Sequence, residues 1–295
     1  MLPRGGRTGE PRQRRPCYTS RIQPKRKGRI GMKLYRYWKI EQRTINIDGE
    51  DKQIKVYGGS NLSEEDASRN ALAKFEMIER KIEGERGVFD DYEVEIREEI
   101  LDEIRPDAVV TRNRYGARVL NVERLLIMDI DQPKFSLGDL FKRNAPQGKE
   151  KIYEMVRSLA AKKYRDFGFR IYETFQGARV IVLGREFDPR DPATQGMMRE
   201  FNSDGLYTLL CAKQACFRAR LTPKPRRMKM RGRKFTFPRE GNDAETQQWL
   251  AEYERESRNF SVCRFVEQVG ASHPADDVVR LHDDLTGALL HLPLA

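Results

Sequence analysis

The chain has 295 residues, of which 38% are hydrophobic and 34% are charged, and its formal net charge is +11 at pH 7. Its length is that of one large domain or two ordinary ones. It contains no run of about eighteen apolar residues, which excludes a membrane-spanning helix, and it lacks the apolar segment of a secretory signal. The four cysteines form no Cys-x-x-Cys pair, so we expect reduced thiols in a cytoplasmic protein without structural zinc.

The charge is concentrated in two places. Residues 1–30 carry +9 and residues 218–239 carry +10, so the remainder of the chain carries −8. The first block is rich in Arg, Pro and Gly and predicts a disordered basic tail over residues 1–31. Two interpretations stay open for it: an arm that binds nucleic acid, or an upstream extension of the reading frame before Met32.

Residues 32–107 predict two strands and a helix. The first strand is expected over 34–40 and 44–47, followed by a hairpin turn at Asp48-Gly49 and a return strand at 53–57. Ser63 followed by acids marks a helix start, and the apolar stripe of that helix comprises Leu72, Phe75, Ile78 and Ile82. The aromatic residues Tyr35, Tyr37 and Trp38 either stack on single-stranded bases or belong to the core.

Residues 108–270 predict an α+β core of the RRM or ferredoxin-like type, βαββαβ. We expect strands at 109–111, 118–120, 125–131, 169–174, 178–183 and 260–269, and helices at 149–165, 203–217 and 243–257. In this arrangement the strand 125–131 is interior to the sheet. Residues 184–202 are expected to form a loop because of Pro189, Pro192 and Gly196. A final helix at 276–290, within residues 271–295, carries His282 as a surface or core residue rather than a catalytic one.

The strand 125–131 ends in two carboxylates, Asp129 and Asp131, separated by Ile130. Side chains alternate along a strand, so both carboxylates point to the same face. Two neighbouring carboxylates repel each other unless a cation lies between them, and hard oxygen ligands suit Mg²⁺ or Mn²⁺. The alternative is that one Asp caps the next element and the other is solvated.

The pattern of an apolar strand ending in Asp-x-Asp, followed by the hairpin run Thr174-Phe175-Gln176-Gly177-Ala178-Arg179, resembles the archaeo-eukaryotic primase–polymerase superfamily. The resemblance covers residues 109–268 and implies that Asp129 and Asp131 are catalytic metal ligands. It also implies that Thr174, Gly177 and Arg179 contact nucleotide phosphate, with Arg179 where the family has a His. A third acidic ligand is expected, for which Asp204 is the nearest candidate and Asp283 the weaker one. The runs 112–116 and 217–225 also resemble those of uncharacterised bacterial proteins.

The second basic block begins with the alternating run 217–222, which places Arg218 and Arg220 on one face of an extended chain, and Pro223 and Pro225 then hold Lys224. Cations without neighbouring acids form an electrostatic footprint for DNA or RNA phosphates, whereas the alternative is a solvated loop. Taken together, these features predict metal-dependent nucleotidyl transfer with nucleoside triphosphates on nucleic acid. Two other functions stay open: a non-catalytic RNA- or DNA-binding protein, and a metal-dependent nuclease.

Overall fold

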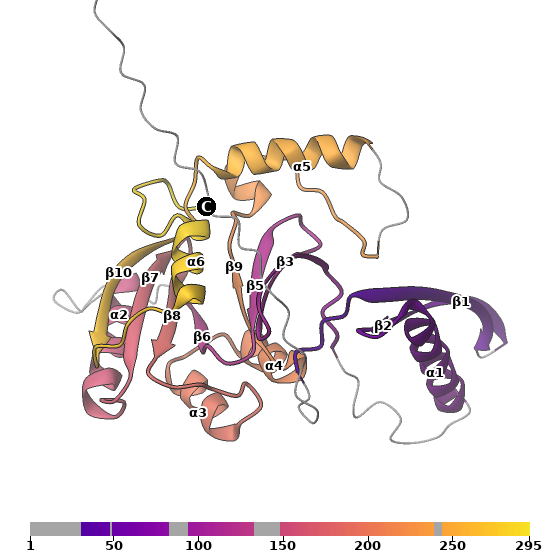
Figure 1. Ribbon diagram of the computed structural model, residues 1–295, viewed down its shortest axis with the longest axis horizontal. Helices are drawn as coiled ribbons and strands as arrows, with labels where there is room; N and C mark the ends of the chain where they lie inside the picture. The colour runs from indigo at the N-terminus through magenta and orange to yellow at the C-terminus, as the bar shows by residue number, and fades with distance from the viewer. Residues whose placement is uncertain (1–30, 48, 83–93, 133–147, 239–243) are drawn as a thin grey trace, which may run out of the picture.

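The computed structural model describes residues 31–47, 49–82, 94–132, 148–238 and 244–295. The strands are β1 (Tyr37–Ile47), β2 (Glu50–Ser60), β3 (Glu99–Arg105), β4 (Ala108–Arg112), β5 (Arg118–Val122), β6 (Ile127–Asp131), β7 (Gly168–Thr174), β8 (Gly177–Leu183), β9 (Phe217–Arg220) and β10 (Cys263–Gly270). The helices are α1 (Glu64–Ile82), α2 (Lys149–Lys162), α3 (Pro192–Glu200), α4 (Gly205–Gln214), α5 (Ala244–Ser257) and α6 (Asp277–Thr286), and a 3-10 turn, η2, spans Pro225–Met228. The predicted α+β class is confirmed (Figure 1).

The N-terminal unit consists of the hairpin β1-β2 and helix α1, as predicted (Figure 1). The ladder closes with Ile47 opposite Glu50, at the position expected for the turn. The Ser63 hydroxyl accepts a hydrogen bond of 3.1 Å from the Asp66 backbone N–H, which confirms Ser63 as the helix cap. Trp38 is buried and donates its indole N–H to the Tyr35 carbonyl, so this ring belongs to the core.

The apolar stripe of α1 differs from the predicted one. The fully buried residues are Ala67, Ala71 and Phe75, whereas Leu72 is exposed. The reason is the close approach of β2: a Cβ at Gly58 would lie 2.0 Å from the Ala67 carbonyl oxygen. Only small residues fit where a helix backbone lies this close to a strand, so the alanines face the hairpin and Leu72 is turned outward.

The sheet that contains the Asp-x-Asp strand has the order β10-β7-β8-β6, and all its neighbours are antiparallel. Strands β6 and β7 are therefore parallel, joined through α2, with β8 inserted between them, which is a split βαβ unit. The fourth strand, β10, pairs with β7 on the far edge. The expectation that the Asp-x-Asp strand is interior is therefore wrong, because β6 is the edge strand of this sheet.

Helices α2 and α6 cover opposite faces of this sheet (Figure 1). On the α2 side Lys149 pairs with Glu173 of β7 at 2.8 Å, and on the α6 side Asp283 pairs with Arg170 of β7 at 2.6 Å. Since alternate residues of a strand face opposite ways, Arg179 of β8 lies on the α6 face, where its guanidinium contacts His282.

The second four-stranded sheet has the order β3-β4-β5-β9. Strands β3 and β4 pair across residues 107 and 108, where a domain boundary was expected, and β9 comes from the second basic block. Both four-stranded sheets contribute to one hydrophobic cluster, which includes Leu120 of β5, Met128 of β6, Val180 of β8 and Ala219 of β9. The basic block therefore begins with a strand of the β3-β4-β5-β9 sheet.

Helix α3 was predicted as loop. Asp191 caps this helix by accepting a hydrogen bond from the Ala193 backbone N–H, and Pro192 occupies its first position. Proline is favoured there because the first N–H of a helix has no intrahelical partner. Among the described residues, no helix is both long enough and apolar enough to cross a membrane.

Candidate functional site

The antiparallel ladder between β6 and β8 brings the predicted carboxylates next to Arg179. Asp129 is directly opposite Arg179 and Asp131 is opposite Gly177. The Arg179 Nε donates to Asp129 Oδ1 at 2.9 Å, and the intervening Ile130 is buried on the other face. The burial pattern of β6 thus agrees with two carboxylates on one face of the strand, as predicted.

Arg179 is buried, with a side chain that is 2% exposed, whereas the Asp129 side chain is 41% exposed. The Arg179 Nη1 donates to the Arg220 carbonyl at 3.1 Å and contacts His282 Nε2 at 3.2 Å. Burial disfavours the charged guanidinium, but the Asp129 carboxylate outweighs this effect and raises the pKa of Arg179 above its ordinary value. Arg179 is therefore a fixed internal cation beneath Asp129.

Three further cations lie near Arg179 and the two carboxylates: Arg220 at the end of β9, Lys224 and Arg227. None of them forms an ion pair with the described residues. The Nε of Arg220 is buried and has no hydrogen-bond partner in the described part of the chain. A buried donor without a partner costs free energy, so the guanidinium of Arg220 is only partly compensated by the described residues.

Burial and mutual repulsion lower the pKa values of these cations. Burial, followed by the charge of Arg179, lowers the pKa of Arg220 to about 10. Burial, followed by the charges of Arg220 and Arg227, lowers the pKa of Lys224 to about 8. In both cases a carboxylate, Asp129 or Asp131, offsets only part of the effect. A site that depresses several cationic pKa values at once favours the binding of an anion.

The segment that carries these cations is held in place by packing. Pro225 opens η2, and Met228 at its end is buried in a small cluster with Tyr253 of α5. The Tyr253 hydroxyl lies 2.7 Å from both the Pro223 carbonyl and the Thr222 hydroxyl. Residues 221–228 therefore present Lys224 and Arg227 from a packed segment, whereas residues 229–238 of the same block form no helix or strand.

The hairpin between β7 and β8 forms the neighbouring wall. Thr174 pairs with Gly177 across a two-residue turn made of Phe175 and Gln176. Gly177 has a packing role, because a Cβ there would lie 2.0 Å from the Ile130 carbonyl oxygen. The turn is linked to the basic segment by Arg227, whose Nη2 donates to Gln176 Oε1 at 2.8 Å.

Arg218, one of the predicted phosphate-binding residues, is placed differently from Arg220. Its guanidinium donates to Glu98 at 2.5 Å and to Asn121 Oδ1 at 2.7 Å. Its charge is therefore neutralised within the β3-β4-β5-β9 sheet, and it is not one of the cations that lack an ion pair.

Asp204 serves as the N-cap of α4, where its Oδ1 accepts a hydrogen bond from the Tyr207 backbone N–H. Its own backbone N–H donates to the Asp129 carbonyl at 3.0 Å, which places α4 against β6. Asp283 on α6, the weaker candidate for a third ligand, pairs with Arg170 of β7 and contacts the neighbouring His282. Among the described residues no group of three or more His, Cys, Asp or Glu side chains could hold a metal ion.

Of the predicted metal ligands, Asp129 and Asp131 are therefore the two that share one strand face. Mg²⁺ is often held by one or two carboxylates together with substrate phosphates, so this pair fits a metal ion that arrives with a phosphate ligand. Arg179 already binds both oxygens of the Asp129 carboxylate. Its Nε donates to Oδ1 at 2.9 Å, and its Nη2 donates to Oδ2 at 3.4 Å. Asp131 is exposed and makes no side-chain hydrogen bond or ion pair with the described residues.

Two residues of this site were missed in the sequence analysis. Arg227 was one of ten cations in the block 218–239, with no feature that distinguished it. His282 was predicted to be a surface or core residue; it is fully buried, and it also contacts Arg179. Its place on one helical face with Val278 and Val279 gave no indication of a polar partner.

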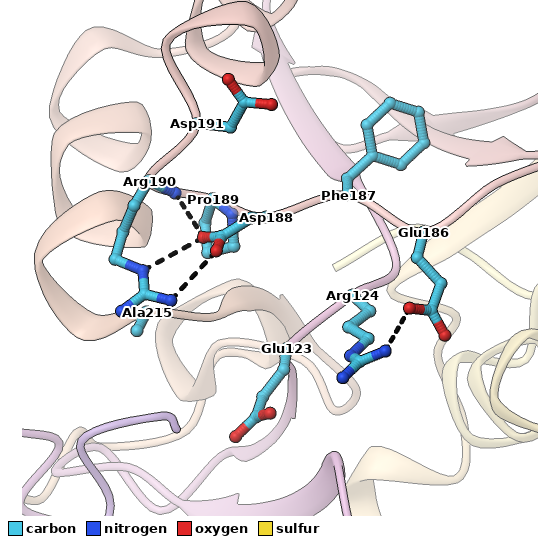
Figure 2. Close-up of a pocket in the computed structure, with 9 residues that line it drawn as sticks. All are labelled: Glu123, Arg124, Glu186, Phe187, Asp188, Pro189, Arg190, Asp191 and Ala215. Carbon is cyan, nitrogen blue, oxygen red and sulfur yellow. Dashed lines mark hydrogen bonds and ion pairs between the residues drawn. The ribbon is translucent and has the colours of Figure 1, made fainter. Parts of the chain in front are cut away.

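Figure 2 shows a separate pocket of about 280 Å³ between the segments 123–124 and 186–191. Its cations are neutralised by neighbouring acids: Arg124 pairs with Glu186, and Arg190 pairs with Asp188 at 3.0 Å. This pocket therefore lacks the uncompensated positive charge found beside Asp131.

Comparisons with protein families, with curated proteins and with solved structures found no match. Functional inference for this chain therefore depends on the site itself.

Proposed function

We propose that this protein binds the phosphates of a nucleotide beside Asp129 and Asp131 and catalyses metal-dependent nucleotidyl transfer on DNA or RNA. The observation that supports the proposal is the convergence of two same-face carboxylates with three cations that have no carboxylate partner among the described residues. Cations on a rigid segment next to paired acids suit a ligand that brings both negative phosphates and a divalent cation.

The burial of each side chain would determine its role in the site. Arg220, Lys224 and Arg227 would donate to phosphate oxygens, because none of them has a carboxylate partner among the described residues. Asp131, which is exposed, and Asp129 would hold Mg²⁺ or Mn²⁺, which as a Lewis acid stabilises charge on a phosphoryl group. Arg179, being buried, would fix Asp129 rather than contact the nucleotide directly.

The second candidate is a non-catalytic nucleic-acid-binding protein, and one specific observation favours it. The ion pair between Arg179 and Asp129 already compensates one of the two carboxylates. With Asp129 satisfied in this way, the site is on balance an anion-binding site, and phosphate binding without chemistry would follow.

Incubation of the protein with a primed template, nucleoside triphosphates and Mn²⁺ separates these functions. Extension of the primer supports nucleotidyl transfer if it is lost in Asp131→Asn and in Asp129→Ala. The control variant Asp102→Asn, at an exposed position of β3, should keep it. Shortening of the strand supports the nuclease. Unchanged nucleic acid that still binds, and whose binding survives EDTA, supports the non-catalytic protein and contradicts the transferase.

A further inference from the structure

The turn between β7 and β8 carries an exposed aromatic side chain at the edge of the cationic site. The Phe175 side chain is 46% exposed, although the other rings of this hairpin, Phe169 and Tyr172, are fully buried. Neither Phe175 nor Gln176 has a positive φ, so this two-residue turn accepts most residue types. The turn geometry therefore gives no reason for a phenylalanine here, and burial in the core gives none either.

One face of the Phe175 ring is braced by a site cation. The Arg227 guanidinium carbon lies 4.3 Å from the ring centroid, which is a cation–π distance. The same guanidinium donates to Gln176 Oε1, so it is held between the ring and the next residue of the turn. With Arg227 on one face and nearly half of the side chain exposed, the ring presents apolar surface to solvent beside the phosphate-binding cations.

The aromatic ring and the phosphate site are joined through this one arginine. Burial and repulsion from Arg226 lower the pKa of Arg227, and the Asp131 carboxylate offsets part of that effect. A ligand that accepts from Arg227 therefore also lies next to Phe175. The chemical class that combines a flat apolar surface with phosphates is a nucleotide, either free or within a single strand.

We infer that Phe175 is a base-stacking residue, and that the site recognises nucleotides by their base as well as by their phosphates. The inference rests on the proposed function, because it requires phosphate binding by Arg220, Lys224 and Arg227. It extends that function by naming the part of the ligand that the cations do not bind. Stacking on an aromatic ring tolerates any base, so we expect little discrimination between bases.

Calorimetric titration with ATP and with tripolyphosphate tests the inference in the wild-type protein and in Phe175→Ala. Both ligands carry three phosphates, but only ATP has a base. We expect the wild type to bind ATP about tenfold more tightly than tripolyphosphate, which corresponds to about 1.4 kcal/mol. In Phe175→Ala this preference should disappear, with the affinity for tripolyphosphate unchanged.

Tyr115→Ala is the matched control, because Tyr115 is 43% exposed and also has an arginine, Arg114, over its ring at 4.8 Å. This variant should keep the preference for ATP. Phe175→Trp gives a direct readout, because its fluorescence should change on addition of ATP and not on addition of tripolyphosphate.

Two outcomes overturn the inference, and they differ in what else they remove. Equal affinities of the wild type for ATP and tripolyphosphate, together with equal affinities for an oligothymidylate and an abasic strand, refute stacking but leave the phosphate site intact. Failure of both ligands to bind removes the proposed phosphate site and, with it, the stacking. The affinities for a single-stranded oligothymidylate and for an abasic strand of the same length tell whether the base belongs to a polymer. If the oligothymidylate binds more tightly and Phe175→Ala abolishes only this difference, the residue belongs to strand binding.

Discussion

At the scale of single residues, the site is defined by charges that the fold has not compensated. Arg218 and Arg179 are cations with carboxylate partners, Glu98 and Asp129. Arg220 and Lys224 lie close to them without such a partner among the described residues, and the pKa of each is lowered, first of all by burial. Along β9 and the segment that follows it, Arg218 is thus a structural residue, whereas Arg220 and Lys224 are available to a ligand.

Lys224 should make phosphate binding depend on pH. With the pKa of Lys224 lowered to about 8, the ammonium is charged at pH 7, and above pH 8 an anion can bind fully only if a proton is taken up. The affinity for tripolyphosphate should therefore fall by up to about tenfold between pH 7 and pH 9 relative to Lys224→Gln. Calorimetry at both pH values measures this difference, and comparison with the variant cancels the ionisation of the ligand.

Lys224→Gln should also bind more weakly at pH 7, by about tenfold, since one charge-assisted hydrogen bond is lost. The exposed Lys213→Gln on α4 is the control and should keep the wild-type pH dependence. Equal pH dependence in the wild type and in Lys224→Gln would show that this ammonium takes no part in binding.

His282 should contribute to stability through Arg179. Asp283 Oδ1 lies 3.1 Å from His282 Nδ1, which places the ring proton there and leaves Nε2 to accept from Arg179. Burial lowers the pKa of His282 to about 4, below the unfolded value of about 6.5. Its contribution is therefore complete above pH 6.5 and is lost as the pH falls towards 4, by about 3 kcal/mol in total.

Urea unfolding of the wild type and of His282→Gln at pH 7 and pH 5 tests this contribution. At pH 7 the variant should be less stable by about 1–3 kcal/mol, because hydrogen bonds to buried partners are lost. The difference should shrink at pH 5, where folding of the wild type must exclude a proton from the ring. A difference that is the same at both pH values would contradict the assigned neutral state of His282.

At the scale of elements, the close contact of β6 and β8 positions the carboxylates. A Cβ at Gly177 would lie 2.0 Å from the Ile130 carbonyl oxygen, whereas nothing lies within 4 Å of a Cβ at Gly196 in α3. We expect Gly177→Ala to lower the free energy of unfolding by about 1–3 kcal/mol. Gly196→Ala should raise it by about 0.5–1 kcal/mol, because glycine is unfavourable inside a helix.

Denaturant unfolding of the two variants measures both effects, and ATP binding reports on the site. Gly177→Ala should also weaken ATP binding, since β6 must shift relative to β8, while Gly196→Ala should leave it unchanged. If Gly177→Ala proved as stable as the wild type and bound ATP equally well, the close approach of the two strands would not be needed to form the site.

Local patterns predicted most elements and the nearest neighbours within the site. Strand alternation placed Asp129 and Asp131 together, and the split βαβ unit follows from the strand, helix and hairpin that succeed one another in the chain. Helix α3 was missed because Pro192 reads as a break unless its position after the cap Asp191 is considered.

Long-range pairing could not be predicted in the same way. Strand β10 pairs with β7, and β9 pairs with β5, across separations that no local signal encodes. The edge position of β6 follows from these pairings. The division between Arg218, which is paired with Glu98, and Arg220, which is not, likewise depends on which strands meet.

At the scale of the whole molecule, positive charge lies in residues 1–30 and 218–239, and the remainder of the chain carries −8. An acidic surface repels a polyanion, so nucleic acid should bind through the two basic blocks. The second block also carries the site: Arg226 is exposed, and Arg227 is bonded to the β7-β8 turn. The two blocks should therefore make separable contributions to binding, a non-specific one and one tied to the site.

The salt dependence of binding to a single-stranded oligonucleotide measures these contributions, because each neutralised phosphate adds about 0.7 to the slope of log affinity against log salt. Removal of residues 1–30 should lower this slope while leaving the affinity for tripolyphosphate unchanged. In the shortened chain, replacement of both Arg226 and Arg227 by Gln should reduce the slope by a further 1.4 or so. The same replacements at Arg69 and Arg80 on α1 should leave it as it is. Complete loss of strand binding on removal of residues 1–30 would mean that the remaining chain has no nucleic-acid surface. The cations beside Asp131 would then bind a free nucleotide alone.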